Sequence, residues 1–307
     1  MGRVHQRIVT TDRPLGLMSS VRLLRFGPAD PSYRLHESGF LRGVSTPEGP
    51  GLLRVERRDR QSFEVHTYGP GAERLIERAP SMLGVDDGDT PEFREHPVLR
   101  KLAKKLSALR LVQTPTVFES FVTMVLQQRV SWRDAAWSYR QILLRHGEPA
   151  PGPFPEVYAQ PPPSLWRSLP QSRYQDLGVD ARRAQTLKRA AVSWRRLEEI
   201  SSMSPQAADK RLRALPGVGV WTSQFVLGFA LGFTDAVPLG DYDLPRLVGF
   251  ALAGEDRADD PRMVELLAPH RGQRFRVIRM LQESGIPTPR FGPRRGSGPG
   301  PGRTSRH

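Results

Sequence analysis

Residues 215–226, LPGVGVWTSQFV, combine a glycine hairpin with the start of an apolar helix. Gly217 and Gly219 follow Pro216, and glycine permits a positive φ and leaves the backbone open to close approach by a ligand. The amides of the turn and of the helix that begins at Val220 then converge on one point, where the helix dipole also favours a phosphate. Because helical patterns flank this turn on both sides, the segment predicts a helix-hairpin-helix that holds a nucleic-acid backbone without reading its sequence.

The charge of the chain points to the same kind of partner. Its 46 Lys and Arg residues against 32 Asp and Glu residues give a formal net charge of +14. A field of this sign attracts phosphates and releases their counterions on binding. A general preference for arginine codons is the alternative explanation, since arginine greatly outnumbers lysine.

Two features of the composition exclude other classes of protein. The 307 residues contain no cysteine, which excludes disulfides, thiolate zinc sites and cysteine-ligated iron–sulfur clusters. The N-terminus lacks an apolar signal core, and no segment is long and apolar enough to span a bilayer. We therefore expect a cytoplasmic protein with no membrane partner.

Three segments of different composition follow one another along the chain. Residues 1–95 form the first segment, in which residues 21–68 alternate short apolar or β-branched runs with turns, and period-two alternation is clearest at Phe63 and Val65. Residues 96–286 carry helical periodicity. Residues 287–307 are rich in Gly, Pro, Ser and Arg, a composition typical of disorder. The prediction is an α+β fold: a small antiparallel β-sheet domain, then a mainly α-helical domain, then a basic disordered tail.

Local patterns predict individual elements within these segments. We expect a strand over residues 21–26 and a helix over residues 71–78 that closes the β region. The prolines of residues 148–164 exclude a helix and indicate a surface connection. Ser204, directly before Pro205, is the expected N-cap of one helix. Helices are expected over residues 97–109, 118–126, 181–199 and 205–214.

Two aspartates precede a further apolar helix in PLGDYDLPRLVGFAL, residues 238–252. An aspartate before a helix is usually an N-cap. We assign this structural role to Asp243, which stands next to Leu244. Asp241 lies at a spacing from the hairpin that leaves it open to a second role.

In this order, the motifs resemble those of the helix-hairpin-helix DNA glycosylase superfamily, and within it the 3-methyladenine DNA glycosylase II family. FESFVTMVLQQRVSWRDAA (118–136) is similar to the helix and turn that enter the DNA, and DLGVDARRAQTLKRAA (176–191) to the Leu-Gly turn and helix. The hairpin with PLGDYDL (238–244) is similar to the catalytic core, and LAPHRGQRFRVIRML (267–281) to the last long helix. The N-terminal β region agrees with the extra sheet domain of this family.

The resemblance implies a monofunctional glycosylase of base excision repair. Such an enzyme hydrolyses the N-glycosidic bond of alkylated bases, of the 3-methyladenine and 7-methylguanine type, after they flip out of duplex DNA. Members that also cut the strand carry a lysine two residues after the second hairpin glycine, which forms a Schiff base with the sugar. Trp221 stands at that position, and indole cannot do this chemistry. The resemblance implies no cofactor and no metal.

Asp241 is the catalytic residue that the resemblance implies. When an alkylated base leaves, positive charge develops on the sugar, and a carboxylate can stabilise that charge and orient or deprotonate the attacking water. Simple capping of the next helix is the alternative role for Asp241.

The resemblance also implies a base pocket and a DNA interface. Its wedge position, after the two glutamines, holds Arg129, whose planar guanidinium can stack in the gap left by a flipped base. Core packing is the alternative for Phe225, and capping of the turn for Gln128. An aromatic residue of the family pocket is replaced near Arg279. The expected pocket residues are Trp221, Phe225, Tyr242 and Trp132. The expected DNA contacts are Gln128, Arg129, Gly217, Val218, Gly219 and Thr222.

The expected partner is double-stranded DNA with damaged bases, bound by a nucleoid-associated monomer. Two other functions remain open at this point. A non-catalytic helix-hairpin-helix DNA-binding protein would not need Asp241. A bifunctional glycosylase and lyase for oxidised bases would need a correctly placed lysine, and Lys210 lies before the hairpin.

Overall fold

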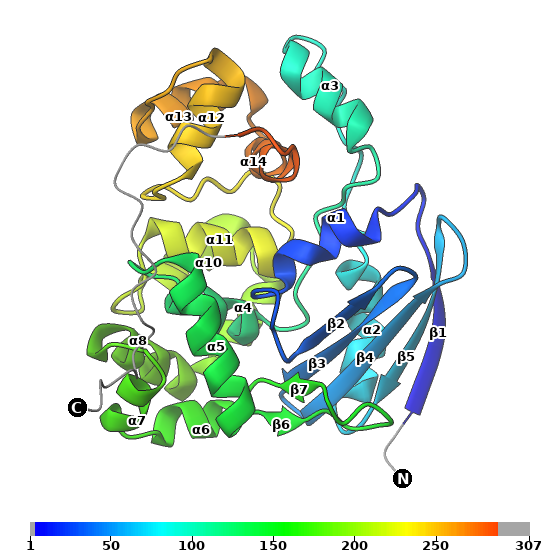
Figure 1. The fold of residues 1–307 in the computed structure, drawn as a ribbon, viewed down its shortest axis with the longest axis vertical. Coiled ribbons are helices and arrows are strands. Elements are labelled where there is room, and N and C mark those ends of the chain that lie inside the picture. The colour runs from blue at the N-terminus through cyan, green and yellow to red at the C-terminus, as the bar shows by residue number, and fades with distance from the viewer. Residues whose placement is uncertain (1–3, 288–307) are drawn as a thin grey trace, which may run out of the picture.

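The computed structural model describes residues 4–287, so residues 288–307 of the predicted tail lie outside the described residues. Figure 1 shows an antiparallel sheet on one side of the molecule and helices on the other. The predicted α+β class, with an N-terminal sheet followed by helices, is confirmed.

The N-terminal sheet has the strand order β1-β5-β4-β3-β2, and all neighbouring strands are antiparallel. Helix α2 (Ala72–Met82) packs on β1, β4 and β5, and it lies behind the sheet in Figure 1. The predicted closing helix over residues 71–78 is therefore confirmed, with a later end. The strands are β1 (Val4–Thr10), β2 (Tyr33–His36), β3 (Gly39–Thr46), β4 (Gly49–Arg57) and β5 (Ser62–Tyr68).

The strand expected over residues 21–26 is wrong. The chain there forms α1 (Leu17–Val21) and the 3₁₀ helix η1 (Arg22–Leu24). Leu17 and Val21 are four residues apart, lie on one helical face and are both buried in the core of the sheet domain. A short apolar run satisfies this burial as a helical turn as well as it would as a strand.

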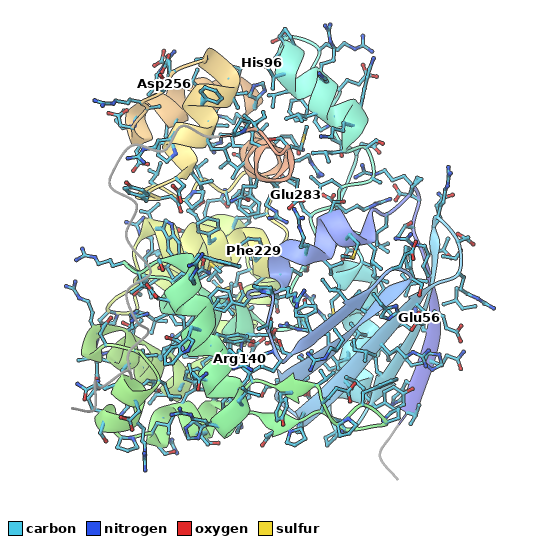
Figure 2. All side chains as sticks on the ribbon, viewed as in Figure 1. Glu56, His96, Arg140, Phe229, Asp256 and Glu283 are labelled. Carbon is cyan, nitrogen blue, oxygen red and sulfur yellow. The ribbon has the colours of Figure 1, made fainter. Side chains whose placement is uncertain are left out.

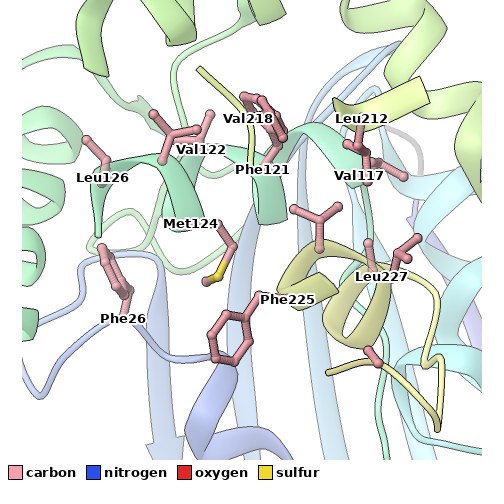
Figure 3. Packing of buried hydrophobic residues seen from close by; sticks show 14 of the residues in the cluster. Phe26, Val117, Phe121, Val122, Met124, Leu126, Leu212, Val218, Phe225 and Leu227 are labelled. Atoms are coloured by element: carbon pink, nitrogen blue, oxygen red, sulfur yellow. The ribbon is translucent and has the colours of Figure 1, made fainter. Parts of the chain in front are cut away.

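The rest of the described chain is mainly helical and has its own core. Helix α4 lies at its centre, with Phe121 and Val125 fully buried, and Figure 3 shows side chains packed around it. The predicted N-cap is confirmed, because the hydroxyl of Ser204 accepts a hydrogen bond from the amide of Ala207 at 3.4 Å. The helices after α2 are α3 (Pro97–Lys105), α4 (Val117–Leu126), α5 (Trp132–His146), α6 (Pro163–Ser168), α7 (Gln171–Asp176), α8 (Ala181–Val192), α9 (Trp194–Glu198), α10 (Pro205–Arg213), α11 (Val220–Ala230), α12 (Leu244–Ala253), α13 (Asp260–Leu267) and α14 (Arg274–Glu283), with 3₁₀ helices η2 (Glu199–Ser202) and η3 (Ala268–His270).

Residues 148–164 are more than the predicted surface connection. Strands β6 (Glu148–Pro149) and β7 (Tyr158–Ala159) form a small hairpin beside β3, and Val157 is fully buried. The amide of Tyr158 donates to the carbonyl of Pro31 at 3.0 Å. Proline allows short extended pieces at a sheet edge and also the first turn of a helix, and α6 (Pro163–Ser168) begins within this segment, so the expectation was only partly correct.

A buried ion pair joins the segment after α2 to α14. Nη1 of Arg276 donates to Oδ2 of Asp87 at 2.9 Å, and Nη2 also contacts this carboxylate. Oδ2 of Asp87 accepts a second hydrogen bond, from the amide of Leu111 at 2.9 Å, and Arg13 lies 3.5 Å away. Both partners of the pair are almost completely buried. The pair therefore fixes α14 against the N-terminal part of the chain.

We expect Asp87→Ala to lower the free energy of unfolding by about 3–5 kcal/mol, because it leaves the Arg276 guanidinium buried without its partner. Arg276→Met should cost less, since Asp87 keeps the amide of Leu111 and the side chain of Arg13. Urea unfolding followed by circular dichroism measures both changes. An Asp87→Ala midpoint equal to that of the unmodified chain would show that the pair is energetically neutral.

Candidate active site

A single large cleft collects most of the predicted site residues. Its volume is about 2160 Å³, and it is lined by the turn after α4, by α8, by the hairpin and first turns of α11, by the start of α12 and by α14. Val218 is the exception among the predicted residues, because it points into the helical core. The predicted residues that line the cleft are Gln128, Arg129, Trp132, Gly217, Gly219, Trp221, Thr222, Phe225, Asp241 and Tyr242.

The two hairpin glycines have different structural roles. Gly217 has φ +96°, and a Cβ at this position would lie 2.1 Å from Oγ1 of Thr186. Gly219 has φ −102°, and nothing lies within 4 Å of where its Cβ would be. The fold therefore requires glycine at position 217, while position 219 keeps open space in front of the backbone.

Helix α11 begins at Val220 with Gly219 as its N-cap, and no side chain of the described residues caps it. The first amides of a helix have no partner within the helix. Gly219 is exposed and Val220 half-buried at this start, so these amides are open to an anion, and the helix dipole adds to their attraction.

Gln128 ties the turn after α4 to the hairpin. Its amide nitrogen donates to the carbonyl of Gly217 at 3.0 Å and to the hydroxyl of Thr222 at 2.9 Å. Thr222 is itself buried at the first turn of α11. These two predicted DNA contacts thus bind each other, and the link fixes the distance between the two parts of the cleft wall.

Arg129 is the tip of the turn between α4 and α5. Its φ is +57°, in the left-handed region that non-glycine residues rarely adopt, and its side chain is exposed. Ser131 then starts α5, with its hydroxyl accepting from the amide of Asp134 at 3.2 Å. The backbone strain at Arg129 presents this side chain at the mouth of the cleft.

Asp241 is held by three N–H donors. Its Oδ1 accepts from the amides of Asp243 at 2.8 Å and Leu244 at 2.9 Å, and its Oδ2 accepts from the indole Nε1 of Trp221 at 2.8 Å. An ionised carboxylate has about four acceptor sites, so this one keeps capacity for a further donor such as water. Asp241 both caps the start of α12 and lies in the cleft wall.

The expectation that Asp243 caps α12 is wrong. Its side chain makes no capping hydrogen bond to the helix, although it stands at the N-cap position. Asp241 takes that role from two residues earlier, because an aspartate side chain reaches the amides two and three residues ahead of it in a tight turn. The sequence identified the right pair of aspartates and assigned the cap to the wrong one.

The predicted pocket aromatics divide into two groups. Trp221 packs edge-on against Phe225 with ring centroids 4.9 Å apart, and Phe225 is also part of the helical core. Tyr242 and Trp132 lie at the outside of the cleft, with 69% and 53% of their surfaces exposed. The ring of Tyr242 lies under the guanidinium of Arg246, 4.3 Å from its centroid. Trp221 and Phe225 form the inner wall.

Sequence reasoning missed one face of α8. Arg182, Gln185 and Arg189 are exposed and line the same cleft, on the helix whose Thr186 lies against Gly217 of the hairpin. Their spacing of three and four residues, which places them on one helical face, was a usable signal. This face supplies two cations to the cleft.

Three further observations limit the chemistry of the cleft. Among residues 4–287, no lysine lines it. The same part of the chain holds no group of three or more His, Cys, Asp and Glu side chains that is placed to bind a metal ion. None of its helices has the length and apolar character needed to cross a membrane.

Comparison with known proteins shows which proteins resemble this chain in sequence and in fold. No protein-family model matches the chain. A DNA-3-methyladenine glycosylase of Bacillus subtilis (strain 168) is 23% identical over 179 residues, which cover 56% of this chain and 59% of the Bacillus protein. The chain thus matches less than two thirds of that relative's length.

Solved structures match over more of the chain. A 3-methyladenine DNA glycosylase from Archaeoglobus fulgidus superposes with a TM-score of 0.76 at 17% identity, over 90% of this chain and 97% of the other. An 8-oxoguanine glycosylase/lyase of Clostridium acetobutylicum, in complex with DNA, superposes with a TM-score of 0.69 at 13% identity, over 92% and 97%. Identities this low establish the fold and no more. The chain therefore has the fold of the helix-hairpin-helix DNA glycosylase superfamily, as its motifs predicted.

Proposed function

We propose that the chain is a monofunctional DNA glycosylase of base excision repair, which hydrolyses the N-glycosidic bond of alkylated bases of the 3-methyladenine and 7-methylguanine type. The observation that carries the proposal is the Asp241 carboxylate, held in the cleft wall by Trp221 and by two backbone amides. Two matched proteins, from Bacillus and Archaeoglobus, bear the name 3-methyladenine glycosylase. Their names support the alkylated class of base.

The fixed carboxylate suits this reaction. Loss of an alkylated base leaves positive charge on the sugar, and a negative charge already in place stabilises that charge without reorganisation. The acceptor capacity that remains on Asp241 can hold the attacking water and take its proton. Trp221, which donates to the same carboxylate, presents an aromatic surface on which the flipped base can stack.

The surfaces around the cleft suit duplex DNA. The uncapped start of α11 offers amides to a backbone phosphate, and the exposed Arg182 and Arg189 of α8 add positive charge to the same cleft. Arg129 is the proposed wedge, because its strained turn presents a planar cation at the cleft mouth. Gln128, by contrast, serves to connect the turn to the hairpin.

The first experiment changes Asp241 to Asn. We expect single-turnover release of methylated bases to fall by about 10²–10⁴-fold or more, since that range is the usual contribution of general-base catalysis alone. The variant also places an amide N–H opposite the Trp221 indole N–H, which breaks that hydrogen bond. Trp221→Phe separates the two effects, because it removes the donor and keeps the carboxylate, and its loss of activity should be smaller.

Asp243→Asn is the matched control for Asp241→Asn. Asp243 is exposed and makes no capping bond through its side chain, so this variant should retain activity. If Asp241→Asn kept full activity on methylated DNA, the catalytic role of Asp241 would be refuted. If the unmodified chain bound DNA and released no methylated base, it would be a DNA-binding protein without this reaction.

The second experiment tests the hairpin as a phosphate site. Gly219→Val adds a side chain in open space, so the free energy of unfolding should change little while affinity for undamaged and damaged duplex falls together. Gly217→Val is the contrasting variant and should destabilise the fold, because its Cβ meets Thr186. Fluorescence anisotropy gives the affinity and thermal unfolding the stability. Normal DNA affinity in a folded Gly219→Val protein would remove the hairpin from the interface.

The third experiment distinguishes the monofunctional enzyme from a glycosylase/lyase. Because Trp221 replaces the lysine and no lysine of the described residues lines the cleft, product DNA should stay full length until it is heated in alkali. Borohydride should trap no covalent adduct between protein and DNA. The assay uses end-labelled duplex on a denaturing gel. A trapped adduct would favour the bifunctional enzyme for oxidised bases instead.

A further inference from the structure

Arg279 is a buried cation that the proposed reaction does not use. It lies on α14 with 3% of its surface exposed. Burial lowers the pKa of its guanidinium to about 10, so the group is still protonated at neutral pH. Arginine is rarely buried without compensation, because removing a charge from water is costly.

The partners of Arg279 offset this burial only in part, through the charge of the nearby Glu283 carboxylate, which raises the pKa of the guanidinium. Its Nη1 donates to Oε1 of Gln282 at 3.4 Å, which is a long hydrogen bond. The nearby carboxylate of Glu283 pairs with Arg22 at 2.8 Å, and no ion pair of residues 4–287 includes Arg279. The guanidinium lies over the ring of Phe229, 5.3 Å from its centroid. Several N–H donors of this side chain therefore have no protein acceptor among the described residues.

A row of aromatic rings connects Arg279 to the catalytic carboxylate. The Phe229 ring is stacked on that of Phe225, with centroids 5.7 Å apart, and Phe225 contacts Trp221, which binds Asp241. Figure 2 labels Phe229 on α11 and Glu283 on α14, the two helices that meet at Arg279. All five groups from Asp241 to Arg279 line the same cleft. The row therefore lines one side of the cleft between the carboxylate and the guanidinium.

We propose that Arg279 is a specificity-determining residue that donates a hydrogen bond to the carbonyl at the far edge of a flipped 6-oxopurine, and so favours guanine-type over adenine-type lesions. This inference rests on the proposed glycosylase function. The glycosidic nitrogen and C6 lie at opposite ends of a purine. An arginine fork recognises the O6 and N7 acceptors of guanine, and O6 remains when N7 is methylated. The 6-amino group of adenine would instead place a donor against a donor, which a buried site rejects.

Methylated DNA provides a direct test within one reaction. Treatment with dimethyl sulfate gives both 7-methylguanine and 3-methyladenine, and both are cationic within DNA. The charge of Arg279 therefore affects both bases in the same sense, and the ratio of their release rates reports the carbonyl contact. We expect Arg279→Met to lower the ratio of 7-methylguanine to 3-methyladenine release by about 10- to 100-fold, the usual effect of losing one hydrogen bond to a charged group.

Two control variants and the form of the measurement separate this role from a structural one. Arg182→Met removes a cleft-lining cation from α8, so it should slow the release of both bases and leave their ratio unchanged. Arg279→Lys keeps the charge and one donor direction and should give an intermediate ratio. Because both bases are released by the same folded molecules, partial unfolding of a variant does not change the ratio.

The outcomes distinguish the inference from the proposed function. If the unmodified protein releases both bases and Arg279→Met leaves their ratio unchanged, the specificity role of Arg279 is overturned and the glycosylase proposal stands. If the unmodified protein releases neither base while it still binds DNA, the glycosylase proposal itself fails, and the inference fails with it.

Discussion

The hydrogen bond between the indole of Trp221 and the carboxylate of Asp241 joins the two segments that build the site. Trp221 belongs to the first turn of the helix after the hairpin, and Asp241 precedes the next helix and caps it. The uncapped start of α11 and the carboxylate are consequently held at a fixed separation. In the proposed complex, a phosphate at the hairpin and a sugar at Asp241 can be neighbours on one strand only if that separation is kept.

A second link fixes the opposite wall of the cleft in the same way. Gln128 bonds the backbone of Gly217 and the side chain of Thr222, so the turn that carries Arg129 cannot move independently of the hairpin. The residues that the sequence predicted as DNA contacts thus divide into two groups. Arg129 is exposed, whereas Gln128 and Thr222 bind each other and support the turn that carries Arg129. The division follows from side-chain length, because the Gln128 amide reaches the hairpin and uses both of its N–H donors there.

The sequence predicted those parts of the fold that a repeated pattern specifies. The apolar stripe of residues 118–126 became α4, and the Ser204-Pro205 pair started α10 where expected. Strand β1 was not expected, because it is an edge strand in which only Val9 is buried, and such a strand shows no alternation. The short run of residues 21–26 was ambiguous for a related reason, since its burial is satisfied by helix or strand.

The sequence predicted most of the residues that line the cleft, but it did not predict which hydrogen bonds they make. The resemblance to the glycosylase motifs selected Asp241 and Trp221, but no pattern specifies which of two aspartates turns its oxygen toward a helix start. Nor did periodicity show that Arg279 is buried, because a charged residue in an amphipathic helix is ordinarily assumed to face water.

At Arg129, the left-handed backbone conformation lowers the stability of the fold, while the side chain is the one proposed to enter the DNA. A non-glycine residue in this region costs about 1–2 kcal/mol, and glycine would remove the cost together with the side chain. An engineer who screened variants of this chain only for heat resistance would select glycine there and discard the cation at the cleft mouth. Stability and the proposed contact with DNA thus favour different residues at position 129.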